Sequence, residues 1–396
     1  MSGAGLLVWG GGGARSARAA RARGAVVVAW PGADTEALAA ERVGFRRAED
    51  VLGENGLAEV EAAGRRFARV WARLPLAEGR SFRELASWRG QSLLWASEGF
   101  LSTASAGARC ARSVELCLRL LEALDPGELD ASGLAGHEAL LLARSATVRG
   151  VLFHGETGAP RPLAVDAGAA LPGGLRGLFG LFAGGRRRAP AAPSGGLAER
   201  SLLLVLLSRP ADEPGLVPLL EAVRADLWLQ PLVLPTTALA SVETRSVRGE
   251  VARAARELRA RCTALQGSAA LAASYVHRGV PFADLARGDL EALLCRRLPR
   301  VVQQLERALE LLEDTRPALL LLGVEERDER RALGLAALAA GVPWVLLRST
   351  AHEPEGPERA DGGPQPAATL AVGPGAEHAA ALRGLREAAR ARVGAP

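Results

Sequence analysis

The segment 315–350, TRPALLLLGVEERDERRALGLAALAAGVPWVLLRST, limits the possible folds of this chain more than any other. Its two apolar runs, Ala318–Leu322 and Val345–Leu347, have the length of buried strands. The sequence between them predicts a polar loop and then a helix to Ala340, with Gly341 as its stop. Buried strands joined through a helix pair in parallel by a right-handed crossover. The segment therefore predicts an α/β fold.

The same pattern occurs at two earlier places in the chain. Leu6–Trp9, the glycines Gly10–Gly13, Ala14–Ala22 and Ala25–Trp30 predict a strand, a turn, a helix and a second strand. Another apolar strand is predicted at Leu202–Leu207. We therefore expect two Rossmann-like units, each a parallel sheet flanked by helices, facing each other across a ligand-binding cleft.

A change of composition separates these two units. Residues 171–196 are rich in Gly, Pro and Arg, which predicts a linker between a first unit at 1–170 and a second at 197–396. Within the linker, apolar residues at helical spacing precede three arginines, so that 175–188 could lie on an anionic membrane surface. A loose linker is the favoured alternative, because the glycines weaken any helix there.

The two halves share a short motif. SWRGQSL at 87–93 is similar to VHRGVPF at 276–282, and both contain an Arg-Gly pair, with the arginines at Arg89 and Arg278. A guanidinium at these positions could bind phosphate through two hydrogen bonds. Capping a helix or pairing with a nearby acid is the favoured alternative for both arginines.

Composition excludes several classes of function. The chain has no lysine, so a P-loop is excluded, and its 49 basic residues are mixed with 44 acidic ones and few aromatics, which argues against nucleic-acid binding. No spacing typical of a zinc site or a hydrolase nucleophile occurs, and no cofactor is expected. Cys110 and Cys117 lie too far apart on one predicted helix for a disulfide. We expect four free thiols and a cytoplasmic protein of a high-GC bacterium.

The glycine run does not match a dinucleotide-binding fingerprint. That fingerprint needs a small residue where Arg15 or Ser16 stands and an acid where the second strand ends in Trp30-Pro31. Backbone N–H groups at a helix start still attract anions. Gly11, Gly12 and Gly13 are therefore candidates for binding a phosphate or carboxylate of an acceptor, with a plain turn as the favoured alternative.

Further candidates follow the predicted strands, where open α/β sheets bind ligands. Acids at a helix start and polar residues in loops also occur without any function. The candidates for catalysis are Glu325, Glu326 and His352, and those for substrate binding are His154, Gly155, Arg278, Arg330, Ser349 and Thr350.

The residues of 318–350 resemble a family. The acidic loop with Glu325 and Glu326, Arg330 in the helix, and the Gly-Val-Pro-Trp-Val strand at 341–345 are similar to GT-B-type glycosyltransferases and related sugar-nucleotide epimerase-like proteins of bacterial surface-polysaccharide synthesis. SWRGQSLLWASEGFL and VHRGVPFADL resemble a further segment of these proteins. The resemblance covers about half of the chain through short motifs. One departure is that Arg348-Ser349-Thr350 replaces a His-Gly turn.

The resemblance implies a GT-B-like arrangement and transfer of a sugar from a nucleotide-sugar to a glycan or lipid acceptor of the cell envelope, with the protein cytoplasmic or peripheral at the inner face of the membrane. The ending Gly394-Ala395-Pro396 stands where a Gly-x-Pro opens the nucleotide-sugar domain of such proteins. This implies that a partner subunit supplies the donor domain, or that the chain is a non-catalytic or truncated relative that acts as a binding partner. A UDP-sugar 2-epimerase-like enzyme is the third alternative.

Overall fold

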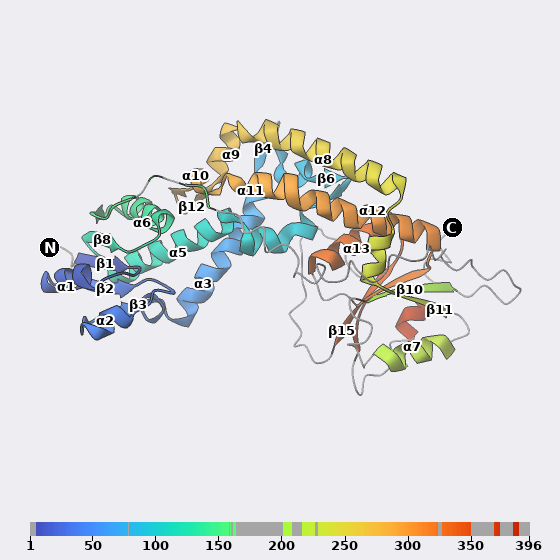
Figure 1. Ribbon diagram of the computed structural model, residues 1–396, viewed down its shortest axis with the longest axis horizontal. Helices are drawn as coiled ribbons and strands as arrows, with labels where there is room; N and C mark the ends of the chain where they lie inside the picture. Colours follow the sequence, from blue (N-terminus) through green and yellow to red (C-terminus); the bar gives the residue numbers. More distant parts are fainter. Residues whose placement is uncertain are drawn as a thin grey trace, which may run out of the picture. The chain divides into compact units, whose positions relative to one another are not determined.

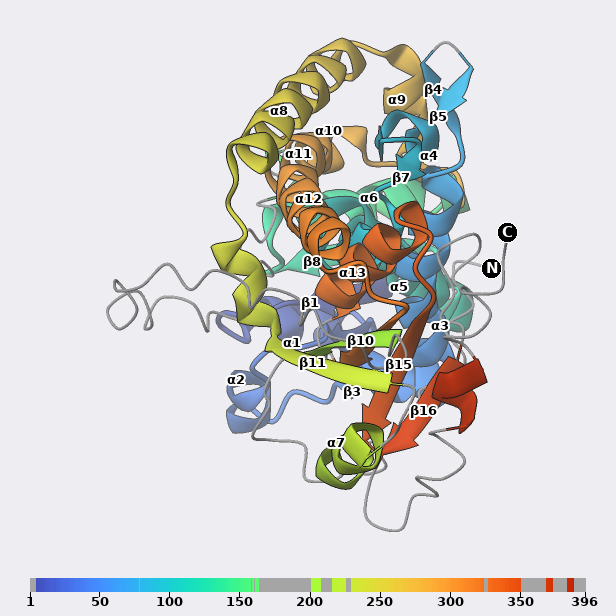
Figure 2. The ribbon, with the colours of Figure 1, turned by 90° about the vertical axis from the view of Figure 1, so that its right-hand side faces the viewer.

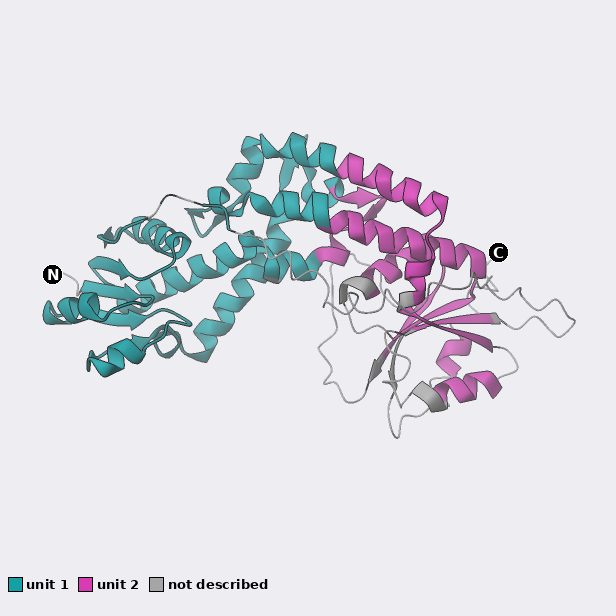
Figure 3. Ribbon diagram, in the orientation of Figure 1, with its two compact units in different colours: residues 1–85, 98–169, 259–296 teal, residues 86–97, 170–258, 297–396 magenta. Residues whose placement is uncertain are grey.

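The computed structural model divides the chain into two compact units (Figure 3). Unit 1 comprises 1–85, 98–169 and 259–296, and unit 2 comprises 86–97, 170–258 and 297–396. Each unit thus contains a segment from the other half of the chain. The structure describes residues 5–77, 79–157, 159, 161–163, 201–207, 216–225, 229–323, 327–349, 368–372 and 383–387. The expected linker at 171–196, with its stretch 175–188, lies outside these residues.

Unit 1 contains a parallel sheet, as the N-terminal pattern predicts, and the sheet has five strands. Its strand order is β3-β2-β1-β8-β9, and every neighbouring pair is parallel. The strands are β1 (Gly5–Trp9), β2 (Val26–Ala29), β3 (Arg46–Arg47), β8 (Glu128–Ser132) and β9 (Leu152–Phe153).

Helices cover both faces of this sheet (Figure 1). Successive side chains of a strand point to opposite faces, so Leu7 and Trp9 pack with α1 and α2, whereas Leu6 and Val8 pack with α3, α5 and α6. Both faces are therefore apolar, as a parallel sheet requires. The helices are α1 (Arg15–Ala22), α2 (Glu36–Ala40), α3 (Ala48–Trp71), α5 (Ala106–Leu124) and α6 (Gly136–Arg149).

Unit 2 also contains a five-stranded parallel sheet, of order β11-β10-β14-β15-β16. Helix α7 (Leu216–Ala225) packs on one face of it (Figure 2), and α13 (Arg327–Ala339) connects β14 to β15. The expected stop of this helix is confirmed, because Gly341 adopts a φ of 62° just after it. The strands are β10 (Ser201–Leu207), β11 (Leu229–Pro235), β14 (Leu319–Gly323), β15 (Trp344–Ser349) and β16 (Ala368–Val372).

The remaining elements connect or flank these sheets. In the first half they are β4 (Pro75–Ala77), β5 (Arg80–Ser81), α4 (Phe82–Leu85), β6 (Ser87–Trp88), β7 (Gln91–Ser92), the 3-10 helix Trp95–Ser97 and the π-helix Phe100–Ala104. In the second half they are the 3-10 helix Thr236–Ser241, α8 (Arg245–Gln266), α9 (Ala269–Ser274), β12 (Val276–His277), β13 (Val280–Pro281), α10 (Ala283–Ala286), α11 (Gly288–Glu291), the π-helix Ala292–Arg297 and α12 (Leu298–Thr315).

The shared Arg-Gly motif forms the same structure in both halves. Strands β6 and β7 form a first hairpin, and β12 and β13 form a second hairpin, both antiparallel. In each hairpin the arginine and the glycine both have a positive φ, 46° and 75° at Arg89-Gly90 and 47° and 85° at Arg278-Gly279. Such values are those of a two-residue type I′ turn, whose twist suits a hairpin. In each half a π-helix and then a long helix follow.

Candidate functional site

The strand order of unit 1 reverses between β1 and β8, which is where ligands bind in open α/β sheets. The loops that follow these two strands touch each other. The Gly10 amide donates to the Ser132 carbonyl at 2.8 Å. A Cβ at Gly10 would lie 2.6 Å from the Gly133 carbonyl oxygen, and one at Gly133 would lie 2.1 Å from that of Gly11. Only glycine permits this approach of two backbones.

The rest of the glycine run is uncovered. Gly11 and Gly12 have φ values of 148° and 84°, and a Cβ built at Gly11, Gly12 or Gly13 would have no heavy atom within 4 Å. These three residues lead into α1, whose first turn carries backbone N–H groups without an intrahelical partner. An anion could therefore approach both the loop and the partial positive charge of the helix start.

Two hydroxyl groups lie at the same end of the sheet. Ser16, in the first turn of α1, has its Oγ 2.8 Å from the Oγ of Ser132, the last residue of β8. Either hydroxyl can donate to the other, and the second then has a proton to donate elsewhere. The sequence alone does not predict this pair, because Ser16 and Ser132 are 116 positions apart.

Trp30 stands where a dinucleotide-binding unit has an acid, and its side chain is hydrogen-bonded to an acid from α6. Its indole Nε1–H donates to Glu138 Oε1 at 2.8 Å, and the other Glu138 oxygen accepts from the Ala135 amide at 3.2 Å. Trp30 directly follows β2, where a dinucleotide-binding unit would present an acid to the ribose. The Glu138 carboxylate approaches this position from α6 and is already hydrogen-bonded through both oxygens.

His154 and Gly155 follow β9 at the edge of the sheet. The His154 amide continues the strand pairing by donating to the Leu129 carbonyl at 2.8 Å. Its ring Nε2 lies 3.8 Å from Glu128 Oε2, and both side chains are largely exposed. A Cβ at Gly155 would lie 2.5 Å from the ring of Phe153, so any larger residue there must displace that ring.

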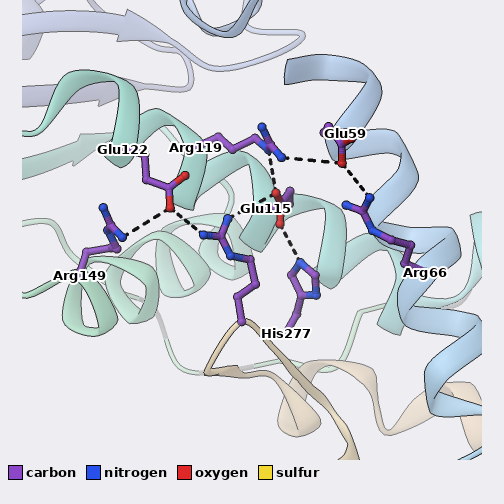
Figure 4. Close-up of polar contacts among 8 residues, drawn as sticks. Glu59, Arg66, Glu115, Arg119, Glu122, Arg149 and His277 are labelled. Carbon is purple, nitrogen blue, oxygen red and sulfur yellow. Dashed lines mark hydrogen bonds and ion pairs between the residues drawn. The ribbon is translucent and has the colours of Figure 1, made fainter. Parts of the chain in front are cut away.

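Arg278 belongs to a cluster of charged residues around a buried carboxylate, which we call the Glu115 cluster (Figure 4). Glu115 on α5 accepts from His277 Nε2 at 2.9 Å, from Arg119 Nε at 2.7 Å and from Arg278 Nη1 at 3.4 Å. Arg278 Nη2 also donates to Glu122 at 2.7 Å. Pairing with acids, the alternative reading of this arginine, is therefore the arrangement observed. The network continues through ion pairs to Arg149, Glu59 and Arg66.

The surroundings of Glu115 favour its ionised form. Burial opposes ionisation, but the hydrogen bonds from His277 and Arg119 and the charge of Arg278 outweigh it, and the pKa of Glu115 lies below its ordinary value. In turn, burial disfavours the charged form of Arg278, but hydrogen bonding to Glu122 and the charge of Glu115 raise its pKa. This cluster holds the second hairpin on α5 and leaves little of Arg278 for a substrate.

Arg89 forms a matching cluster in unit 2, which we call the Glu306 cluster. The Arg89 guanidinium donates to both oxygens of Glu306, at 2.8 and 2.9 Å, and the Trp88 indole donates to the same carboxylate at 2.7 Å. Glu306 lies on α12 with its side chain only 4% exposed. Both Arg-Gly arginines thus pair with a buried glutamate of a long helix.

The buried carboxylate of Asp289 caps α5, although the two lie more than 180 positions apart in the sequence. The Asp289 oxygens accept from the Ala106 and Gly107 amides, the first of α5, at 2.6 and 2.7 Å. Burial raises the pKa of Asp289 to about 6, against the effect of these two hydrogen bonds. Asp289 stands near the start of its own helix, α11, and its role at α5 could not be predicted from this position.

The candidates of unit 2 are only partly described. Arg330 lies half-buried on α13, and Ser349 is the last residue of β15. The other candidates of this unit, Glu325, Glu326, Thr350 and His352, lie outside the described residues. The structure therefore brings together Gly11, Gly12 and Gly13 with Ser16 and Ser132, and it places Arg278 elsewhere in unit 1.

Comparison with known proteins adds no family to this geometry. The sequence matches no protein-family model and has no significant similarity to a curated protein. Within the described part of the chain, no group of three or more His, Cys, Asp or Glu side chains could hold a metal ion. None of the helices in that part combines the length and the apolar character needed to cross a bilayer.

Proposed function

We propose that this chain is a glycosyltransferase-like protein of bacterial cell-surface polysaccharide or glycolipid synthesis, and that the loop Gly11–Gly13 of unit 1 binds an anionic group of its substrate. The substrates are a nucleotide-sugar and a glycan or lipid acceptor. Candidates at the second unit are Glu325, Glu326 and His352 for catalysis, with Arg330, Ser349 and Thr350 for binding.

The observation that carries this proposal is the uncovered glycine loop at the strand-order reversal of a parallel sheet. The loop leads into the start of α1, and the hydroxyl pair Ser16–Ser132 lies at the same end of the sheet, so N–H and O–H donors are available near this open loop. Such donors suit a phosphate or a carboxylate. A sugar transfer from a nucleotide donor needs positive potential at the diphosphate and a base at the acceptor hydroxyl. Two parallel sheets in one chain are compatible with separate donor and acceptor sites.

Calorimetric titration of the full chain with UDP-, GDP- and CMP-sugars tests this function. We expect one of these donors to bind, and binding of none would overturn the proposal. Release of the nucleotide that depends on an added glycan or lipid acceptor supports transfer. Nucleotide release without any acceptor favours the epimerase-like alternative, and binding without release favours a non-catalytic partner.

A charge introduced into the loop tests the site itself. Gly13 has an ordinary φ and open space around it, so Gly13→Ser should leave the affinity for the anionic substrate unchanged. Gly13→Glu should lower that affinity at least about tenfold, because the added carboxylate repels the anion. Gly249→Glu on α8 of unit 2, also in open space, adds the same charge as a control. Equal affinity of Gly13→Glu and Gly249→Glu would show that the anion binds elsewhere.

The wider assembly is also part of the proposal. Absence of donor binding to the chain alone would leave the non-catalytic alternative, in which a partner subunit supplies the donor domain and donor binding appears only in its presence. A membrane contact through 175–188 predicts that vesicles with anionic lipid sediment the full chain but not a variant without these residues. Equal sedimentation of both would contradict it.

A further inference from the structure

Two buried carboxylates attach the segment 259–296 to α5 in unit 1, and their partners differ in charge. Glu115 of α5 accepts from His277 and from two arginines. Asp289, in the segment itself, is 3% exposed and accepts from the first two backbone amides of α5, which carry no net charge. Cationic partners favour the ionised form of a carboxyl group, whereas burial disfavours it. The two carboxylates should therefore respond in opposite ways to a change of pH.

The space around the Asp289 carboxylate is filled. A Cβ built at Gly107 would lie 3.2 Å from Asp289 Oδ2, 3.3 Å from the Tyr275 ring and 2.8 Å from the Phe67 ring. The Tyr275 hydroxyl is buried as well and has no hydrogen-bond partner within the described part of the chain. The carboxylate thus lies beside aromatic rings and the backbone of α5, where an ionised group lacks the stabilisation that water provides.

Three other ionisable groups interact with the charge of Asp289. Arg109 of α5 lowers the pKa of Asp289, but it has the smallest effect, and burial has the largest and raises this pKa to about 6. Cys110 of α5 and Tyr275 also experience the Asp289 charge. Burial raises the pKa of Cys110 to about 12 and that of Tyr275 well above its ordinary value. Of these four groups, only Asp289 changes its charge between pH 5 and pH 7.

We propose that Asp289 is a proton-sensitive cap, which binds the segment 259–296 to α5 more strongly when its carboxyl group is protonated. The neutral carboxyl group keeps an oxygen that accepts from the α5 amides, and it no longer holds a charge away from water. This property does not depend on the substrate proposed above.

The direction of the effect follows from the difference between the folded and the unfolded chain. The pKa of Asp289 is higher in the folded chain, so its stabilisation is complete below the unfolded pKa near 3.8 and is lost as the pH rises through about 6. Glu115 acts in the opposite direction, because its contribution is lost as the pH falls below about 4.5. The segment should therefore be attached most strongly near pH 5.

Amide NMR shifts of the full chain test the protonation directly. The Ala106 and Gly107 amides donate to the carboxylate, so their shifts should change with one midpoint near pH 6. Asp289→Asn cannot take up this proton and should lack the change. Asp284→Asn is the control, because Asp284 pairs with Arg144 in an ion pair that lowers its pKa, and this variant should keep the midpoint. Constant shifts of both amides from pH 4.5 to pH 7.5 would overturn the inference.

Urea unfolding at pH 5 and pH 7 measures the consequence for stability. With pKa values of about 6 in the folded and 3.8 in the unfolded chain, Asp289 alone should raise the folding equilibrium constant about tenfold between pH 7 and pH 5. The parent chain should show this rise relative to Asp289→Asn, since other groups such as His277 are common to both. An equal pH dependence of the two chains would also overturn the inference. The amide shifts of the parent chain decide the question even if Asp289→Asn does not fold.

Discussion

The same three-residue arrangement stabilises each hairpin. A ring N–H and the following arginine both donate to one buried glutamate, from Trp88 and Arg89 to Glu306 and from His277 and Arg278 to Glu115. A buried carboxylate must be compensated in this way, because removing it from water costs several kcal/mol. The arginines that the sequence suggested as phosphate ligands therefore have a structural role in both units.

Replacing Glu115 should destabilise the protein and change its response to acid. Glu115→Gln leaves the charges of Arg119 and Arg278 without their shared partner, and we expect a loss of about 3 kcal/mol in the free energy of unfolding at pH 7. The pKa of Glu115 is lowered in the folded state, so its stabilisation is complete above the unfolded pKa near 4.5 and is lost as the pH falls below it. The variant should lack this acid-dependent loss. Urea unfolding between pH 3 and pH 7 measures both effects.

Glu122 provides the matched control for this experiment. It also pairs with Arg278, but its side chain is 34% exposed, and exposed ion pairs contribute less than about 1 kcal/mol. Glu122→Gln should therefore change stability little at any pH. If the two variants lose the same stability at pH 7, the burial of Glu115 is not the cause of its contribution to stability.

At the scale of the element, the start of α5 shows how closely unit 1 is packed. Its first amides are capped by Asp289, and a Cβ at Gly107 would lie 2.8 Å from the Phe67 ring and 3.3 Å from that of Tyr275. Phe67 and Tyr275 are themselves stacked, with ring centroids 6.2 Å apart. The glycine is required by close packing and not by its backbone angles.

Two glycine-to-alanine changes should have opposite effects. Gly107→Ala must displace the Phe67 ring, and we expect a loss of about 1–3 kcal/mol of stability. Gly136→Ala, in the first turn of α6, meets no atom within 4 Å and should stabilise by up to about 1 kcal/mol through the lower entropy of the unfolded chain. Thermal unfolding of both variants measures the difference. A neutral Gly107→Ala would mean that this region repacks without cost.

Strands β1, β2, β10, β14 and β15 and helices α1 and α13 could be predicted because their signals are local, whereas β3, β8 and β16 were not predicted. Apolar runs, the glycine turn and the helix stop at Gly341 lie within about 35 residues of sequence. The hairpins had a weaker signal, because an Arg-Gly turn with positive φ at arginine is less usual than Asn-Gly. The partners of Glu115 and Asp289 lie more than 160 positions away, except for Arg119, and no periodicity encodes such pairs. Within the candidate site, the glycines could be predicted, but the Ser16–Ser132 contact could not.

At the scale of the whole molecule, each unit is completed by a segment from the other half of the chain. Residues 259–296 supply unit 1 with the second hairpin, the cap of α5 and the Tyr275 and Phe282 rings that pack on Phe67. The Leu163 amide also donates to the Leu285 carbonyl at 2.9 Å. The first half of the chain therefore lacks part of its own core.

A fragment of residues 1–169 should accordingly not reach a stable native state alone. Without 259–296 it leaves Glu115 with fewer partners and exposes the aromatic surface of Phe67 and Trp71, a larger loss than the few kcal/mol that a single core substitution costs. Joining 259–296 to it through a long Gly/Ser linker should restore cooperative unfolding and resistance to protease. The same fusion with Tyr275→Ala and Phe282→Ala is the control, because it keeps the length but removes the packing, and it should behave like the fragment. Cooperative unfolding of 1–169 at the same urea midpoint as the fusion would show that 259–296 adds nothing to the core of unit 1.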